Sequence, residues 1–257
     1  RKVRDQATKW SRTRYQFQRP LSDFELVQKN LATMAALDYA MDSVLYMTTG
    51  MLDRHDEDIM LETAICKVFC SEMGWRVTNC GMQIMGGESY MTENEVERVF
   101  RDSRINLIVE GANEVMQSFI FAYGGKQLAE NMLSVKNALG WNKDEGLGAN
   151  IGRILKNSTN FKLVRAAIPL GIEIFGGVRR NRPAAPKVHA SLQAQAERLA
   201  WLICEHSHQF KRASKHYEEA IITRQCVQAR LADNAMWIHA FACTLSKLDQ
   251  DLRRGGE

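Results

Sequence analysis

The chain has 257 residues, of which 45% are hydrophobic and 25% are charged, and this composition is typical of a soluble globular protein. No apolar run approaches the roughly 18 residues of a membrane-spanning helix, so the sequence predicts no such helix. The net charge is only +4, and six cysteines without Cys-x-x-Cys spacing indicate free thiols in a reducing compartment. The sequence begins with Arg and shows no signal peptide, and we expect it to be one part of a longer protein.

The first twenty residues are strongly basic. They contain seven Lys or Arg residues and a single acidic residue, Asp5, and the aromatic residues Trp10, Tyr15 and Phe17 lie among them. Such a segment could bind nucleic acid or another phosphate-rich ligand. The alternative is the solvated face of a helix.

The residues that follow predict amphipathic helices. From Asp23 apolar residues recur at three- and four-residue steps, with Ser22 or Asp23 as the N-cap and Gly50 as the stop. A second helix is predicted over about 58–83 and ends at Gly86-Gly87. A short polar helix follows over about 93–101.

The apolar run 105–109 is interpreted as a buried connector, because a single short strand would have no partner. A third long helix should begin near Asn113 and end before Gly124-Gly125. Residues 136–160 are rich in Gly, Asn and Lys and predict weak order, and 161–187 are ambiguous. Two last helices are predicted over about 188–214 and 217–251.

The prediction is therefore an all-α fold. An up-down helical bundle occupies residues 1–133, a flexible basic linker residues 134–187, and a second, smaller helical bundle residues 188–257.

Three patterns resemble ligand sites but lack the partners that such sites need. The glycines of residues 146–152 miss the dinucleotide spacing by one residue, and no strand precedes them. Glu205 and His208 form one metal-binding half-site where a di-iron bundle needs two. Cys66 and Cys70 lack the rest of a zinc site. The sequence predicts no metal.

Glu110 is the candidate catalytic residue. It follows the apolar residues 107–109, which should desolvate its carboxylate and raise its proton affinity. Gly111 allows close backbone approach, and a helix capped by Asn113 would direct its N-terminal amides at the site. The alternative is a structural glutamate that precedes a helix.

Four motifs in consistent register resemble the acyl-CoA dehydrogenase family. Residues 101–111 match R-D-x-R/K-I-x-x-I-x-E-G, residues 83–87 match Q-I-x-G-G, and residues 14–17 match R-x-x-F. Residues 24–32 are similar to F-G-L-I-Q-E-K-L-A of the very-long-chain branch. This resemblance covers residues 1 to about 130, and residues 188–251 resemble the C-terminal extension of that branch.

The resemblance implies the C-terminal part of an FAD-dependent enzyme of fatty acid β-oxidation, which converts a long-chain acyl-CoA to trans-2-enoyl-CoA. Glu110 would remove the α-proton while a hydride leaves the β-carbon for the flavin N5. Val109 and Gly111 would line the thioester, and the Glu110 amide would polarise its carbonyl. In this family the N-terminal half supplies most flavin contacts and much of the acyl tunnel. The C-terminal part alone is therefore expected to be inactive.

The resemblance also implies the cofactor contacts and the partners. In a homodimer, one set of residues would reach the FAD of the neighbouring subunit: Arg14, Phe17, Gln83, Ile84, Met85, Gly86 and Gly87. Ala112, Asn113 and Glu114 would also contact FAD. Arg14 would face the FAD pyrophosphate, so nucleic-acid binding is not needed to explain the basic first segment. An electron-transfer flavoprotein would accept the electrons, in the mitochondrial matrix, at the inner membrane face or in a bacterial cytoplasm.

Some positions depart from the family pattern. Ala112 replaces the usual Thr or Ser, and the lost hydroxyl bond should cost about 1 kcal/mol of FAD affinity. Glu25 replaces a Gly or Gln near the cofactor. These two residues favour the alternative function, a non-catalytic assembly or scaffold module. Residues 145–187 are basic and amphipathic, and the hypothesis of peripheral membrane contact stands beside that of a solvated loop.

Overall fold

The computed structural model describes residues 1–139 and 187–255, together with residues 146, 149, 152, 168–170, 172–173, 176–179 and 182–185 between them. Helices dominate these residues, and the strands among them are two residues long, so the all-α prediction is confirmed. The chain divides into two compact units. Unit 1 comprises Arg1–Gln117 and Met236–Glu257, and unit 2 comprises Ser118–Ala235.

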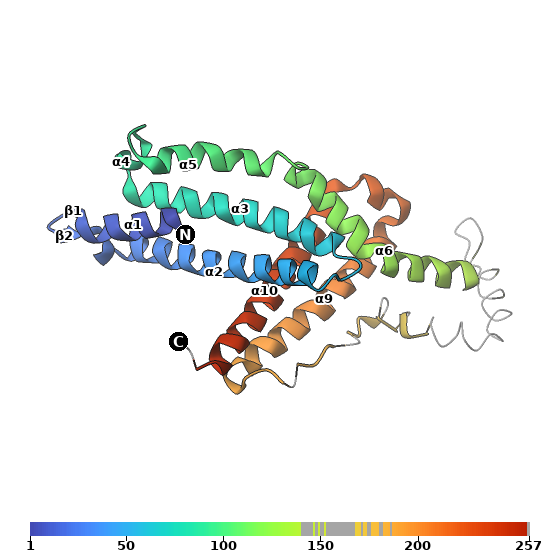
Figure 1. The fold of residues 1–257 in the computed structure, drawn as a ribbon. Coiled ribbons are helices and arrows are strands. Elements are labelled where there is room, and N and C mark those ends of the chain that lie inside the picture. The colour runs from blue at the N-terminus through green and yellow to red at the C-terminus, as the bar shows by residue number, and fades with distance from the viewer. Residues whose placement is uncertain are drawn as a thin grey trace. The chain divides into compact units, whose positions relative to one another are not determined.

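Unit 1 is a set of packed helices. In chain order its elements are α1 Lys2–Thr13, β1 Tyr15–Gln16, β2 Arg19–Pro20, η1 Leu21–Asp23, α2 Glu25–Asp53, α3 Met60–Met85, α4 Gly87–Tyr90, α5 Glu95–Arg104 and η2 Ile105–Leu107. Helix α3 contacts α1, α2 and α5, and these helices lie side by side in Figure 1. Their shared core consists of Val3, Ala7, Met34, Leu37, Val77, Ile84, Met85 and Val96.

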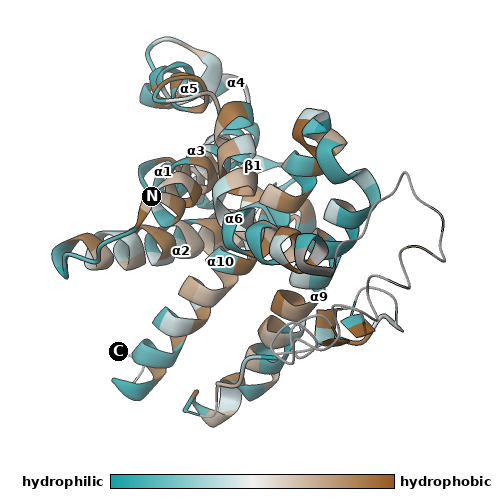
Figure 2. Ribbon diagram, turned by 90° about the vertical axis from the view of Figure 1, so that its right-hand side faces the viewer, coloured by the Kyte–Doolittle hydropathy of each residue, from teal (hydrophilic) through white to brown (hydrophobic). Residues whose placement is uncertain are grey.

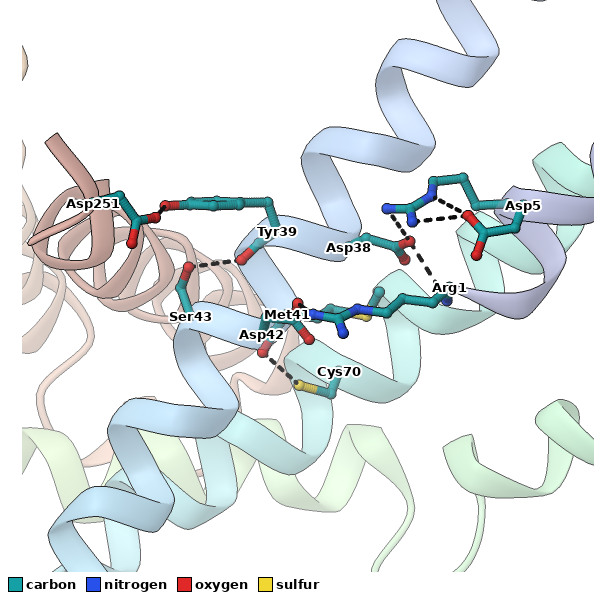
Figure 3. A network of polar contacts seen from close by, with 10 residues as sticks. Arg1, Asp5, Asp38, Tyr39, Met41, Asp42, Ser43, Cys70 and Asp251 are labelled. Carbon is teal, nitrogen blue, oxygen red and sulfur yellow. Dashed lines mark hydrogen bonds and ion pairs between the residues drawn. The ribbon is translucent and has the colours of Figure 1, made fainter. Parts of the chain in front are cut away.

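Helix α1 is fixed to its neighbours by charge as well as by packing. Arg4 lies 3.1 Å from the carboxylate of Asp38, which is only 4% exposed. Arg1 pairs with Asp42, and Figure 3 shows these two residues near Asp38. Lys2 pairs with Glu95 of α5. Several cations of the basic first segment are therefore used for contacts inside unit 1.

The C-terminal part of α10 (Gln225–Arg253) completes unit 1. Ala240 and Cys243 pack with Val44 and Phe69 of α2 and α3 in a second core cluster. The Tyr39 hydroxyl donates a hydrogen bond of 2.6 Å to Asp251 (Figure 3). Residues far apart in the sequence thus share one core.

Unit 2 contains most of α6 (Asn113–Leu139), η3 Ala190–Leu192, α9 Gln193–Tyr217, η4 Glu218–Thr223 and the first part of α10. Figure 2 shows both hydrophilic and hydrophobic residues along α9 and α10. In α9 buried residues recur at steps of four, as in an amphipathic helix: Ala196, Ala200, Cys204 and His208. Gly125 of α6 packs against the Phe210 ring, where a Cβ would overlap it. Lys211 donates to the buried Glu173 at 2.6 Å.

Several predicted helix ends are wrong. Helix α2 runs through Gly50 to Asp53, and its N-cap is Phe24, without a side-chain capping bond from Ser22 or Asp23. One glycine in a helix interior costs only about 1 kcal/mol, too little to end a long packed helix. Helix α6 likewise continues through Gly124-Gly125 to Leu139, since Gly125 is needed against Phe210. By contrast, α3 ends at Gly86 as predicted, with φ of 64°.

The predicted buried connector is also wrong. Residues 105–107 form the 3-10 turn η2, and Ile105, Ile108 and Val109 are 49%, 51% and 42% exposed. A 3-10 turn there directs the apolar side chains away from the core formed by α1, α2, α3 and α5.

The predicted domain boundaries remain a prediction, and residue 133 lies inside α6. Most of residues 145–187, where membrane contact was predicted, lie outside the described residues. Among those described, no helix is long and apolar enough to cross a bilayer.

Candidate functional site

Glu110 and Gly111 form a tight turn between η2 and α6, called here the 110–111 turn. Their φ angles are 55° and 91°. The left-handed conformation costs an L-residue such as Glu110 about 1–2 kcal/mol. Glycine is favoured at position 111 because L side chains rarely adopt this φ, and a Cβ there would also lie 2.9 Å from the Met116 sulfur. Strained backbone of this kind persists only where its surroundings hold it, and it is concentrated at functional sites.

A polar network from α3 holds the 110–111 turn. The Lys67 ammonium donates to the Gly111 carbonyl at 2.6 Å and to the Asn113 side-chain oxygen at 2.7 Å. The Asn113 amide donates to the Ser71 hydroxyl at 3.0 Å and to the Glu72 carboxylate at 2.7 Å. A turn with this anchoring has one fixed orientation on α3.

The side chain of Asn113 does not cap α6, contrary to the prediction. It is 4% exposed and points to α3, while the Ala112 carbonyl accepts the Val115 and Met116 N–H groups at 2.9 and 3.0 Å. The polar atoms of Asn113 are all engaged, so its side chain has none free for a cofactor. Ala112 is half-buried, and Glu114 is exposed in the first turn of α6.

The Glu110 carboxylate is exposed in this chain, contrary to the predicted desolvation. Apolar residues close to it in the sequence are exposed as well: Ile108 and Val109, and Val115 at 63%. These three residues are called here the apolar collar. The carboxylate would lose water only when another molecule or surface covers the collar.

Arg14 and Phe17 lie at a small hairpin. Strands β1 and β2 pair Tyr15 with Pro20 and Gln16 with Arg19, which leaves Phe17 and Gln18 as a two-residue loop. Both loop residues have positive φ, 52° and 65°, as a type I′ turn requires, although Asn and Gly are preferred there. The Phe17 ring is 86% exposed, and Arg14 and Arg19 are exposed beside it.

Residues 83–87 have a divided role. Ile84 and Met85 are 6% and 7% exposed in the core, so only their backbone could meet a ligand. Gln83 is exposed, and space is open where Cβ atoms of Gly86 and Gly87 would lie. The buried Ser89 hydroxyl lies 2.9 Å from the Met82 carbonyl and 2.8 Å from that of Gly86, and fixes this turn.

The 110–111 turn lies apart from the hairpin and residues 83–87 within one chain. Lys67, which holds the 110–111 turn, and Gln83 are both on α3, 16 residues apart, which corresponds to about 24 Å along a helix axis. Figure 1 shows the hairpin and α4 at one end of α3 and the connection from α5 to α6 toward the other. One flavin ring cannot contact both ends.

Sequence reasoning missed Lys67, Ser71 and Glu72. The available signal was a pair of polar residues, Lys67 and Ser71, spaced by four and thus on one face of a predicted helix. Among the described residues no group of His, Cys, Asp or Glu side chains could hold a metal ion. Glu205, one of the two weighed metal ligands, instead accepts a hydrogen bond of 2.9 Å from Arg179.

Known proteins resemble this chain in sequence and fold. Residues 1–123 match the family model of the acyl-CoA dehydrogenase C-terminal domain. The mitochondrial very long-chain specific acyl-CoA dehydrogenase of Mus musculus is 31% identical over 246 residues, which are 94% of this chain and 35% of that protein. A probable acyl-CoA dehydrogenase of Bacillus subtilis is 36% identical over 133 residues, 45% of this chain and 22% of that protein.

A crystal structure titled as an acyl-CoA dehydrogenase complexed with FAD, from Bacillus anthracis, has the same fold. Its TM-score is 0.71 at 23% identity, and the match covers 99% of this chain and 40% of that one. The chain spans about a third of the length of the curated very long-chain relatives that it matches. Residues 1–123 are therefore an acyl-CoA dehydrogenase C-terminal domain, and the chain belongs to the acyl-CoA dehydrogenase family.

Proposed function

We propose that this chain is the base-bearing C-terminal part of an FAD-dependent dehydrogenase that converts long-chain acyl-CoA to trans-2-enoyl-CoA. Similarity to a very long-chain specific relative over 94% of the chain supports the substrate class. The observation that carries the proposal is the 110–111 turn, which presents one carboxylate in a strained conformation that α3 holds in place.

The chain's part in catalysis is to position a base and exclude water from it. The Glu110 carboxylate accepts the proton from the carbon next to the thioester carbonyl. When the acyl chain covers the apolar collar, the carboxylate loses water, which makes it a more effective base. Lys67 keeps the turn from rotating away, because it holds the Gly111 carbonyl and Asn113 together.

The residues at the hairpin and at 83–87 fit a flavin nucleotide. Phe17 supplies an exposed ring, Arg14 a cation for a phosphate, and Gly86 and Gly87 a backbone without side chains. A flavin held by these residues would supply the hydride acceptor. Since about 24 Å of α3 separates these groups from the 110–111 turn, we assign them to the cofactor site of a second subunit in a homodimer. An electron-transfer flavoprotein is the proposed electron acceptor.

The test uses the full-length protein that contains this chain. Under anaerobic conditions, a long-chain acyl-CoA should bleach the visible absorbance of bound flavin. Glu110→Gln should retain the flavin and slow bleaching by roughly 100- to 10,000-fold, the contribution of a positioned general base. Glu93→Gln is the matched control, an exposed glutamate between α4 and α5, and should bleach at the wild-type rate.

The scaffold alternative predicts a different result. A folded, full-length protein that binds neither flavin nor acyl-CoA would establish it and reject the dehydrogenase. Bleaching of Glu110→Gln at the wild-type rate would reject Glu110 as the base while leaving the dehydrogenase intact.

A further inference from the structure

Two cysteines flank Lys67 on the turn of α3 that supports the 110–111 turn. The sulfurs of Cys66 and Cys70 are 4.0 Å apart, and both residues are half-buried. The Cys70 thiol also donates a weak hydrogen bond of 3.9 Å to the Met41 carbonyl of α2 (Figure 3). The proposed dehydrogenation uses neither thiol.

We propose that Cys66 and Cys70 are a reversible oxidation site, at which a peroxide converts the two thiols into a disulfide and loosens the 110–111 turn. The modification itself follows from the thiol geometry alone. Only its effect on catalysis rests on the proposed function.

The chemistry balances with peroxide as the oxidant. The Cys66 thiolate attacks one peroxide oxygen, the O–O bond breaks, and Cys66 becomes a sulfenic acid while hydroxide leaves and is protonated. The Cys70 sulfur then attacks the Cys66 sulfur, the S–O bond breaks, and a water leaves. The two thiols lose two electrons in total, and the peroxide gains them.

The surroundings assign different roles to the two thiols. A hydrogen bond from Cys70, followed by one from Thr48, lowers the pKa of Cys66 to about 7, although burial opposes this. The same Cys66 contact and burial raise the pKa of Cys70. Cys66 is thus the attacking thiolate and Cys70 the resolving thiol. The ionisable groups around the pair come from three helices, with Asp42 on α2, Glu62 on α3, and His239 and Cys243 on α10.

Closing the disulfide must distort α3. Side chains four residues apart on a helix have Cβ atoms about 5–6 Å apart, whereas a disulfide requires about 3.5–4.5 Å. The helical turn that tightens contains Lys67, whose ammonium holds both the Gly111 carbonyl and Asn113. Oxidation should therefore weaken these two contacts, and the strained bond should be easy to reduce.

The first experiment locates the modification in the purified full-length protein. After hydrogen peroxide treatment and alkylation, trypsin cleaves at Lys67, and mass spectrometry should find the two flanking peptides joined through Cys66 and Cys70. Dithiothreitol should separate them. Cys226 is the control, because it is an exposed free cysteine. Oxidation of Cys226 with Cys66 and Cys70 still reduced would overturn the proposal.

The second experiment tests the link to the 110–111 turn by hydrogen exchange, which does not depend on any enzyme activity. Amides of residues 108–114 should exchange at least several-fold faster in the oxidised protein. Cys70→Ser cannot form the disulfide and should show no change with peroxide, and Lys67→Met should show the faster exchange without it. A disulfide that forms without any change in exchange would overturn the link, whatever becomes of the proposed dehydrogenase.

Discussion

Gly50 and Gly81 lie inside neighbouring long helices but have opposite surroundings. At Gly81 a Cβ would overlap Val3 of α1 and lie 3.1 Å from the Met34 methyl, whereas nothing lies within 4 Å of a Cβ at Gly50. Gly81 therefore permits the close approach of α1 to α3. The glycine in α2 only adds flexibility to the unfolded chain.

Alanine at these two positions should have effects of opposite sign. Gly81→Ala should lower the free energy of unfolding by about 1–3 kcal/mol, because an extra methyl is forced into a packed core. Gly50→Ala should raise it by about 0.5–1 kcal/mol. Urea titration of both variants measures this directly, and a Gly81→Ala protein as stable as wild type would contradict the packing of α1 on α3.

The contact between Tyr39 and Asp251 joins two helices that are about 200 residues apart in the chain. Burial, followed by this hydrogen bond, raises the pKa of Tyr39, so the phenol stays protonated and donates at neutral pH. The hydrogen bond should therefore help to hold the end of α10 in unit 1.

Tyr39→Phe should lower the free energy of unfolding by about 1.5–3 kcal/mol, the value of a hydrogen bond to a charged group. Tyr46→Phe, also in α2 but 62% exposed, should be neutral. The difference between wild type and Tyr39→Phe should shrink above about pH 10, where tyrosine ionises in the unfolded chain before it does in the fold. Equal stability of wild type, Tyr39→Phe and Tyr46→Phe at neutral pH would contradict the hydrogen bond between Tyr39 and the end of α10.

At the level of elements, periodicity in the sequence predicts where the helices are but not where they end. The stripe that begins near Asp23 and the Gly86-Gly87 stop both correspond to real features of α2 and α3. Gly50 and Gly125 mislead, because distant contacts decide whether a glycine interrupts a helix. Lys67 and Ser71 are recognisable in the sequence as a polar pair on one helix face. Their partners Gly111 and Asn113 could not be predicted, since they lie more than 40 residues away in the sequence.

For the candidate site, the sequence indicates the carboxylate and its apolar neighbours but not their exposure. Residues 107–109 look like a core segment because they are apolar, yet Val109 is 42% exposed beside Glu110. An apolar run in the sequence indicates only that its side chains are to be covered from water. It does not say whether the same chain, a substrate or another subunit covers it.

The two candidate surfaces of the chain are separate. The 110–111 turn with its apolar collar lies toward one end of α3, and the hairpin with residues 83–87 lies at the other (Figure 1). About 24 Å of α3 lies between them and keeps them apart. Two such chains could each provide the base at one cofactor and the flavin contacts at the other, which is the physical basis of the proposed homodimer.

Proton abstraction by Glu110 is the central claim, and isotope exchange tests it most directly. The full-length protein is incubated anaerobically with a long-chain acyl-CoA in deuterium oxide, and deuterium at the α-carbon of the recovered acyl-CoA is measured. The wild-type protein should incorporate deuterium, and a flavin-loaded Glu110→Gln variant should incorporate none above the rate without protein. Incorporation by that variant at the wild-type rate would show that another group removes the proton.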